Sequence, residues 1–175
     1  FDVLGQLTKI QYPQGGYTRY DYSANPIASV KGAISCSMNF NEVAAKHVCS
    51  LSNGSCSPNA EATTQYTPSL WGGGLPFNNE MDVTDPYSNV TKHIFREEYY
   101  GVTSPKETDE YIYSGNTFLL RTIHTAYLSN PASDLAAGLD LDYPQTITTS
   151  YNDVSPTLTK SVSYQYDTQN IASLG

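Results

Sequence analysis

Three parts of the chain repeat one pattern, and this pattern limits the folds that the sequence can adopt. Each part has a run of β-branched and aromatic residues, a turn rich in Pro, Gly, Asn or Asp, and a second such run that ends in Tyr-x-Tyr. In a strand, side chains at i and i+2 point to the same face, so both tyrosines of a pair lie together on a sheet, where rings of neighbouring strands stack. The pairs are Tyr20 and Tyr22, Tyr111 and Tyr113, and Tyr164 and Tyr166. The pattern predicts a mainly β protein built from antiparallel hairpins.

The first hairpin is the clearest of the three. Residues 7–12 form its first strand and residues 17–22 its second, with Pro13 and Gly15 in the turn between them. Pro fixes φ for such a turn and Gly accepts a positive φ. Two later hairpins are expected, over residues 90–100 with 107–113 and over residues 145–151 with 158–166.

Further segments are expected to add strands to a curved or coiled sheet, and a β-sandwich is the alternative architecture. We expect further strands at residues 42–49, 61–66 and 118–127, and a broken strand pair at 27–40. Residues 67–89 are expected to be irregular, because they contain Gly72-Gly73-Gly74 and Asp85-Pro86. One short helix, of about two turns, is expected near residues 132–139.

Length and charge narrow the classes of function. The 175 residues correspond to one domain or two very small ones, and we expect a single β domain over residues 1–175. Because the net charge is -8, nucleic acid and anionic membranes are unsuitable partners, since both bind clustered Lys and Arg. No apolar run approaches the roughly 20 residues that cross a bilayer, so membrane insertion is not expected.

The three cysteines lie within one stretch. Cys36, Cys49 and Cys56 all fall in residues 27–89, which lie outside the regular pattern and form a candidate insertion. Because the number of cysteines is odd, at most one internal disulfide forms and one thiol is left over. Cys49 and Cys56 flank a turn-forming hexapeptide, so their disulfide is the favoured pairing, and a bridge from Cys36 to either of them or free thiols are the alternatives. The paired spacing of a structural zinc site is absent, so we expect no metal and no cofactor.

The repeated pattern resembles the YD-repeat, or RHS-repeat, family. The unit of that family is approximately Gly, a spacer, Leu-Thr, a hydrophobic strand, Pro-x-Gly, Thr-x-Tyr, Tyr-x-Tyr-Asp and Gly-Asn. Residues 5–22 match this unit nearly throughout and residues 164–174 match its Tyr-Asp end, whereas the middle copy has Ser114 in place of Asp. The positions that carry the resemblance are Gly5, Leu7, Pro13, Gly15, Tyr20, Asp21, Tyr22, Tyr111, Tyr113, Tyr164, Tyr166 and Asp167.

The resemblance implies a piece of a much larger bacterial protein that is secreted or displayed on the cell surface. Members of the family look like long β-sheets that coil into a hollow shell, and in toxin-carrying members the shell encloses a passenger domain. The self-cleaving Asp-Pro-x-Gly-Leu motif of such shells is absent, because Asp85-Pro86-Tyr87 lacks the Gly and Leu. The chain is then expected to be shell wall, with neighbouring repeats of the parent chain and an enclosed passenger as partners. Exposed sheet edges also predict edge-to-edge self-association.

Residues suited to catalysis are few. None of the three histidines accompanies a Gly-x-Ser-x-Gly nucleophile motif, and adjacent carboxylates on a strand point to opposite faces. We therefore expect no catalytic residues and no enzymatic activity. Trp71, followed by three glycines, belongs either to the plug of a β core or to an alternative function. In that alternative, a β-sandwich module binds carbohydrate or protein through exposed Tyr and Trp71.

Overall fold

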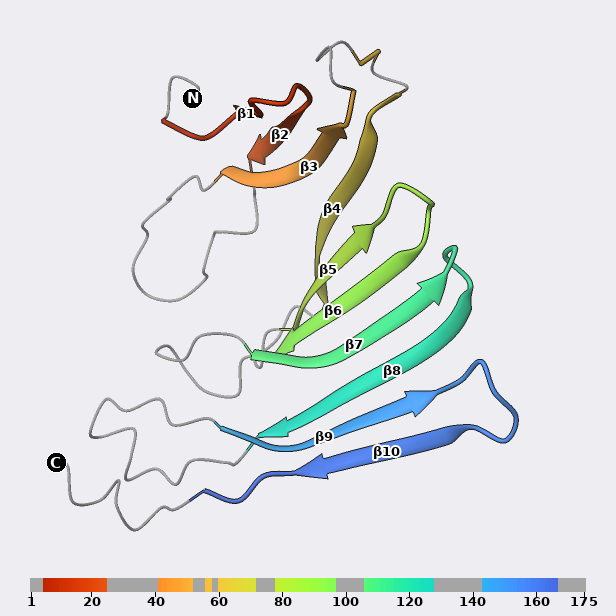
Figure 1. The fold of residues 1–175 in the computed structure, drawn as a ribbon. Coiled ribbons are helices and arrows are strands. Elements are labelled where there is room, and N and C mark those ends of the chain that lie inside the picture. The colour runs from red at the N-terminus through yellow and green to blue at the C-terminus, as the bar shows by residue number, and fades with distance from the viewer. Residues whose placement is uncertain are drawn as a thin grey trace, which may run out of the picture.

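The described residues of the protein form a single antiparallel sheet of ten strands (Figure 1). The computed structural model describes residues 5–24, 41–51, 56–57, 60–71, 78–96, 106–127 and 143–166. Each strand pairs with the next one along the chain, and β1 does not pair with β10, so the sheet is open. These described residues contain no α-helix. The strands are β1 (Lys9–Gln11), β2 (Tyr17–Ala24), β3 (Asn41–Cys49), β4 (Ala62–Trp71), β5 (Asn78–Thr84), β6 (Val90–Arg96), β7 (Lys106–Ser114), β8 (Phe118–Tyr127), β9 (Pro144–Tyr151) and β10 (Leu158–Ser163).

The three expected hairpins are confirmed. β1 pairs with β2, β6 with β7, and β9 with β10, all antiparallel. The first turn has the chemistry that its sequence predicts, since Gly15 and Gly16 adopt φ values of 89° and 76°. The expected strands at 42–49 and 118–127 are also confirmed, as β3 and β8.

Within residues 67–89, the described residues 67–71 and 78–84 are β-strand, which corrects the expectation of an irregular segment from their Gly and Pro content. β4 continues through Pro68 to Trp71, and β5 occupies Asn78–Thr84. Pro68 is tolerated because β3 pairs with β4 only over Ala62–Gln65, so that edge of β4 has no described ladder beside Pro68. Residues 41–51, 60–71 and 78–89 of the candidate insertion thus contribute β3, β4 and β5 to the common sheet. The expected strand pair at 27–40 and the helix near 132–139 lie outside the described residues.

Register shifts curve the sheet. They interrupt the ladders β2–β3, β6–β7, β7–β8 and β8–β9. An extra residue in one strand bends that strand and increases its twist. Figure 1 shows the result, a fan of strands that bends from β1 at one edge to β10 at the other.

The register sorts the side chains into an apolar face and a polar face. Because alternate residues of a strand point to opposite faces, paired residues can be followed from strand to strand. One series of pairs leads from Tyr66 through Val83 to Thr91 and Ile112. Following every ladder this way, the apolar face carries Val48, Tyr66, Met81, Val83, Phe95, Ile112, Ile123, Ile147 and Val162, and among them the polar residues Lys46, His93, Glu110, Arg121 and Lys160.

The opposite, polar face holds most of the charged and hydroxyl side chains. It carries Arg19, Asp21, His47, Glu80, Asp82, Lys92, Asp109, His124, Thr148, Ser150 and Ser161. Neighbouring side chains there bond across the strands, as Thr148 and Ser161 do at 2.9 Å.

The described residues do not enclose a hydrophobic core. Their only buried hydrophobic residues are Tyr17 and Cys49, and most residues of both faces are half-buried. Within the described ranges the strands therefore form one layer, which is held mainly by its ladders. In the described ranges, no helix is long and apolar enough to span a bilayer.

Candidate functional site

The tyrosine pairs of the repeat occupy different positions in the sheet. The pair Tyr20 and Tyr22 lies in β2, and the pair Tyr111 and Tyr113 lies in β7. The third pair lies beyond the last residue of β10, Ser163, which corrects the expected end of that strand. The ladder nevertheless reaches into this pair, because the Tyr164 N–H donates to the Gln145 carbonyl at 2.9 Å.

The middle pair is not equivalent to the other two, contrary to the expected repeat. Tyr111 and Tyr113 stand opposite Lys92 and Val90, which places them on the polar face. Tyr20 and Tyr22 lie on the apolar face, opposite Lys46 and Val43. Tyr164, two positions after Val162, also lies on the apolar face. The sequence pattern alone could not distinguish these faces.

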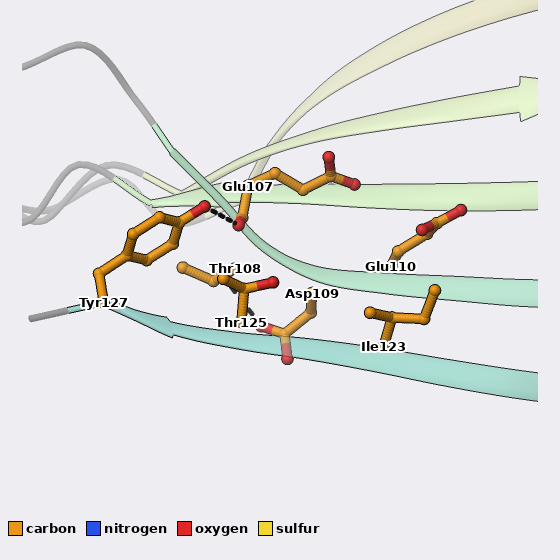
Figure 2. Close-up of a pocket in the computed structure, with 7 residues that line it drawn as sticks. All are labelled: Glu107, Thr108, Asp109, Glu110, Ile123, Thr125 and Tyr127. Carbon is orange, nitrogen blue, oxygen red and sulfur yellow. Dashed lines mark hydrogen bonds between the residues drawn. The ribbon is translucent and has the colours of Figure 1, made fainter. Parts of the chain in front are cut away.

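A different tyrosine contact recurs in three antiparallel strand pairs, of which the middle one is β7–β8 and not the expected hairpin β6–β7, and we call it the tyrosine latch. A phenol hydroxyl at the end of the second strand donates to a backbone carbonyl near the start of the first strand. The latches are Tyr22 to Leu7 in β1–β2, Tyr127 to Glu107 in β7–β8 (Figure 2), and Tyr166 to Pro144 in β9–β10, each at 2.8 Å. Each latch satisfies a carbonyl at the open end of a hairpin and contributes about 1 kcal/mol. The repeating unit is therefore a latched hairpin, with Tyr127 as the middle member.

In the part of the chain that the structure describes, both outer strands have one backbone edge without a neighbouring strand. β1 has three residues and β10 has six, all of them exposed. Within the described part of the chain, each pairs on one side only. Such edges are templates for further strands.

Glu61, which precedes β4, has a carboxylate that contacts side chains of β2 and β3. We call its surroundings the corner cluster, formed by Tyr17, Arg19, Asp21, His47, Glu61 and Thr63. The Glu61 side chain is only 3% exposed. It accepts hydrogen bonds from the Tyr17 hydroxyl at 2.6 Å and from Arg19 Nε and Nη2 at 3.0 and 2.8 Å. The two-pronged contact fits the fork geometry of arginine.

The electrostatics of the corner cluster follow from this contact. The Arg19 bond, and after it the Tyr17 bond, lowers the pKa of Glu61 from 4.5 to about 2, against the opposing effect of burial. The same carboxylate raises the pKa of the Tyr17 hydroxyl and raises that of Arg19. Glu61 is thus held as an anion and Arg19 as a cation.

His47 links the corner cluster to a second carboxylate. Its Nε2 lies 2.9 Å from Asp21 Oδ2, and its Nδ1 lies 2.9 Å from Thr63 Oγ1. The order hydroxyl, imidazole, carboxylate is also that of a nucleophilic triad. Thr63, however, lies on a regular strand directly opposite His47, and His47 Nδ1 also lies 3.4 Å from Glu61. Both ring nitrogens are therefore engaged within the cluster, which serves to join β2, β3 and the start of β4.

The disulfide closes the same corner. Cys49, at the end of β3, bonds to Cys56 with a Cα–Cα distance of 5.9 Å, which is the pairing favoured from the sequence. Cys49 is 1% exposed and stands opposite Tyr17. Because both sulfurs are in the disulfide, neither is available as a thiolate ligand for zinc. Among the described residues, no three His, Cys, Asp or Glu side chains gather as metal ligands.

Lys92 and two further histidines also form cross-strand pairs with carboxylates. The Lys92 ammonium donates to Glu80 at 2.6 Å and to Asp82 at 3.1 Å, and this contact lowers the pKa of Glu80. Burial raises the pKa of Asp82, whose Oδ1 has no hydrogen-bond partner in the described structure. Every histidine faces a carboxylate on a neighbouring strand, since His93 contacts Glu107 at 2.6 Å and His124 contacts Asp109 at 2.7 Å.

A small hollow of about 120 Å³ lies over β7 and β8 (Figure 2). Its lining residues are Glu107, Thr108, Asp109, Glu110, Ile123, Thr125 and Tyr127. Figure 2 shows the Glu107 and Glu110 carboxylates pointing away from that of Asp109. Glu107 is bonded by His93, and Asp109 by Thr108 and His124, so these two acids are already engaged within the sheet.

The remaining residues singled out from the sequence are spread along the sheet. Pro13 and Gly15 form the first turn, and Leu7 supplies a latch carbonyl. Gly5 has a φ of 77° ahead of β1. The backbone of Trp71 ends β4, and its expected role in ligand binding stays a prediction, while Asp167 lies outside the described residues.

Sequence reasoning missed the corner cluster because its members are far apart in the chain. Glu61 is 44 residues from Tyr17 and 42 from Arg19. The available signal was an isolated acidic residue just before a strand, close to a cysteine that forms a disulfide. Tyr127 was missed because it lacks a second tyrosine two residues away.

Comparison with protein-family models, curated proteins and solved structures gave no match.

Proposed function

We propose that the chain is a non-enzymatic structural segment of a larger YD/RHS-like protein, a piece of β-sheet shell that continues into neighbouring repeats. On this proposal the parent protein is secreted or displayed on a bacterial surface, and the shell encloses a passenger or meets a surface partner. The observation that carries the proposal is a ten-strand open sheet without its own core in the described residues.

The single-layer architecture supports this proposal. An ordinary domain buries apolar residues between two layers. Here the apolar face is only half-buried, and the stabilising contacts run along the sheet as ladders, latches and cross-strand ion pairs. Such contacts extend naturally to a further hairpin, as in repeat proteins whose units are stabilised by their neighbours.

The strand order also suits continuation. Ten antiparallel strands in sequence order leave β10 antiparallel to β1. A following copy in the same orientation therefore presents its β1 in the direction that an antiparallel ladder with β10 requires. An odd number of strands would place these two edges parallel.

A tandem chain tests the proposal. Two copies of the sequence are joined end to end, and amide hydrogen exchange is measured by NMR in β10 of the first copy and in the single chain. We expect the amides of Thr159, Ser161 and Ser163 to become protected only in the tandem chain. Ser161→Pro in the first copy is the matched control, because it removes one outward donor from an edge strand. Equal exchange in the tandem and single chains would overturn lateral continuation.

A further inference from the structure

We propose that β10 receives a partner strand with an acidic residue opposite Lys160 and apolar residues opposite Leu158 and Val162. The inference rests on the proposed lateral continuation of the sheet and specifies the chemistry of the strand that fits this edge. The strand that fits best reads apolar, any residue, acidic, any residue, apolar, and β1 of an identical copy, which has no acidic residue, is a weaker fit.

The hydrogen-bond pattern identifies the backbone groups that are available. Tyr164 and Gln145 form a hydrogen-bonded pair of the β9–β10 ladder. Because hydrogen-bonded and non-hydrogen-bonded pairs alternate, every second residue of β10 turns its N–H and C=O toward β9. Those residues are Leu158, Lys160 and Val162. The N–H and C=O groups of Thr159, Ser161 and Ser163 therefore point outward.

Because of this alternation, the side chains of Leu158, Lys160 and Val162 lie closest to those of an added strand. Toward an added antiparallel strand, Leu158, Lys160 and Val162 occupy non-hydrogen-bonded pairs, in which Cα atoms lie about 4.5 Å apart and side chains touch most closely. All three belong to the apolar face. Leu158 is 59% exposed and Val162 is 41% exposed, so both have apolar surface left to cover.

The charge of Lys160 selects the central residue of the partner. Lys160 is exposed and makes no ion pair with the described residues. Opposite charges directly across an antiparallel pair stabilise it, and like charges destabilise it. An acidic residue is therefore the side chain best suited to the position opposite Lys160.

The same lysine disfavours pairing of two β10 edges. The antiparallel register that brings Leu158 of one copy opposite Val162 of a second copy also brings Lys160 opposite its own counterpart. A lysine at this place is one of the devices by which edge strands avoid self-association. The edge thus favours a strand of different sequence over a second copy of itself.

The experiment uses two peptides, Thr-Val-Thr-Glu-Thr-Val-Thr and the same peptide with Lys in place of Glu. Each is titrated into the isotope-labelled full chain, and NMR reports the shift and exchange protection of the Thr159, Ser161 and Ser163 amides. We expect the Glu peptide to bind about fivefold more tightly than the Lys peptide, which corresponds to about 1 kcal/mol. In the variant Lys160→Glu, the preference should reverse.

The outcomes separate the inference from the proposed function. Reversal of the peptide preference in Lys160→Glu, with protection of the outward amides, supports the inference. Equal binding of both peptides at this edge overturns the inference and leaves lateral continuation standing. Binding of neither peptide overturns the inference, and the tandem chain then decides lateral continuation separately.

Discussion

Replacement of Glu61 by Gln tests the corner cluster most sharply. Gln keeps the shape of the side chain but replaces Oε2, which accepts from Arg19 Nη2, with a donor. It also removes the negative charge that strengthens the hydrogen bonds from the Tyr17 hydroxyl and Arg19 Nε. Breaking a buried ion pair costs about 3–5 kcal/mol. Arg19 is a third exposed and keeps its contact with Asp21, so the cost should fall below that range. We expect the free energy of unfolding to decrease by about 2–3 kcal/mol at pH 7.

The pH dependence of this loss follows from the lowered pKa of Glu61. The folded-state pKa is about 2, against 4.5 for the ordinary group, so the unfolded chain takes up a proton first as the pH falls. The stabilisation by ionised Glu61 is therefore complete above about pH 5 and is lost as the pH falls from 4.5 toward 2. The stability difference between the natural chain and Glu61→Gln should shrink over the same range.

Urea unfolding from pH 7 to pH 2 measures both effects. Asp153→Asn is the matched control, since Asp153 is exposed in the β9–β10 turn. We expect that control to change the unfolding free energy by less than about 0.5 kcal/mol. A Glu61→Gln loss below that size, or one that stays constant down to pH 2, would mean that ionised Glu61 does not stabilise the corner cluster.

Three further predictions concern the turns, the disulfide and the latches. Gly16→Ala should lower the free energy of unfolding more than Gly115→Ala does, because a Cβ at Gly16 would lie 2.5 Å from the Cys49 carbonyl oxygen, whereas Gly115 has open space around it. Equal losses of unfolding free energy in urea would contradict this. Both glycines have positive φ, so Gly115→Ala should still cost about 1 kcal/mol. Replacing Cys49 and Cys56 together by Ser should lower the unfolding free energy by about 2–3 kcal/mol, as expected for a loop of this size, and an unchanged urea midpoint would count against it. Tyr127→Phe should cost about 1 kcal/mol through loss of its latch, whereas Tyr87→Phe, at a site 85% exposed, should cost nothing measurable in the same assay.

Local patterns predicted much of the fold. Residues 118–127 coincide with β8, and the Pro13–Gly16 turn joins β1 to β2 as expected. These features depend on neighbours in the sequence, so periodicity and turn chemistry were sufficient. β5 was missed although Met81 and Val83 alternate with Glu80 and Asp82, because glycines before it and Asp85-Pro86 after it suggested a loop.

The long-range contacts could not be predicted in the same way. Placing Glu61 beneath Arg19 requires the pairing of β3 with β2 and the closure of the disulfide loop. Likewise, the face of a tyrosine pair depends on register, and a shift of one residue moves a side chain to the other side. Tyr111 and Tyr113 therefore match the sequence pattern but lie on the polar face, opposite Lys92 and Val90.

Residue-by-residue hydrogen exchange of β10 in the single chain shows whether the outer edge of this strand is open. If the sheet ends in an open edge, the amides of Thr159, Ser161 and Ser163 exchange fast, while those of Lys160 and Val162, bonded to β9, are protected. An open edge therefore gives an alternation of fast and slow exchange along the strand. Uniform protection from residue 159 to residue 163 would contradict it, because it would mean that the outer edge of β10 is already covered.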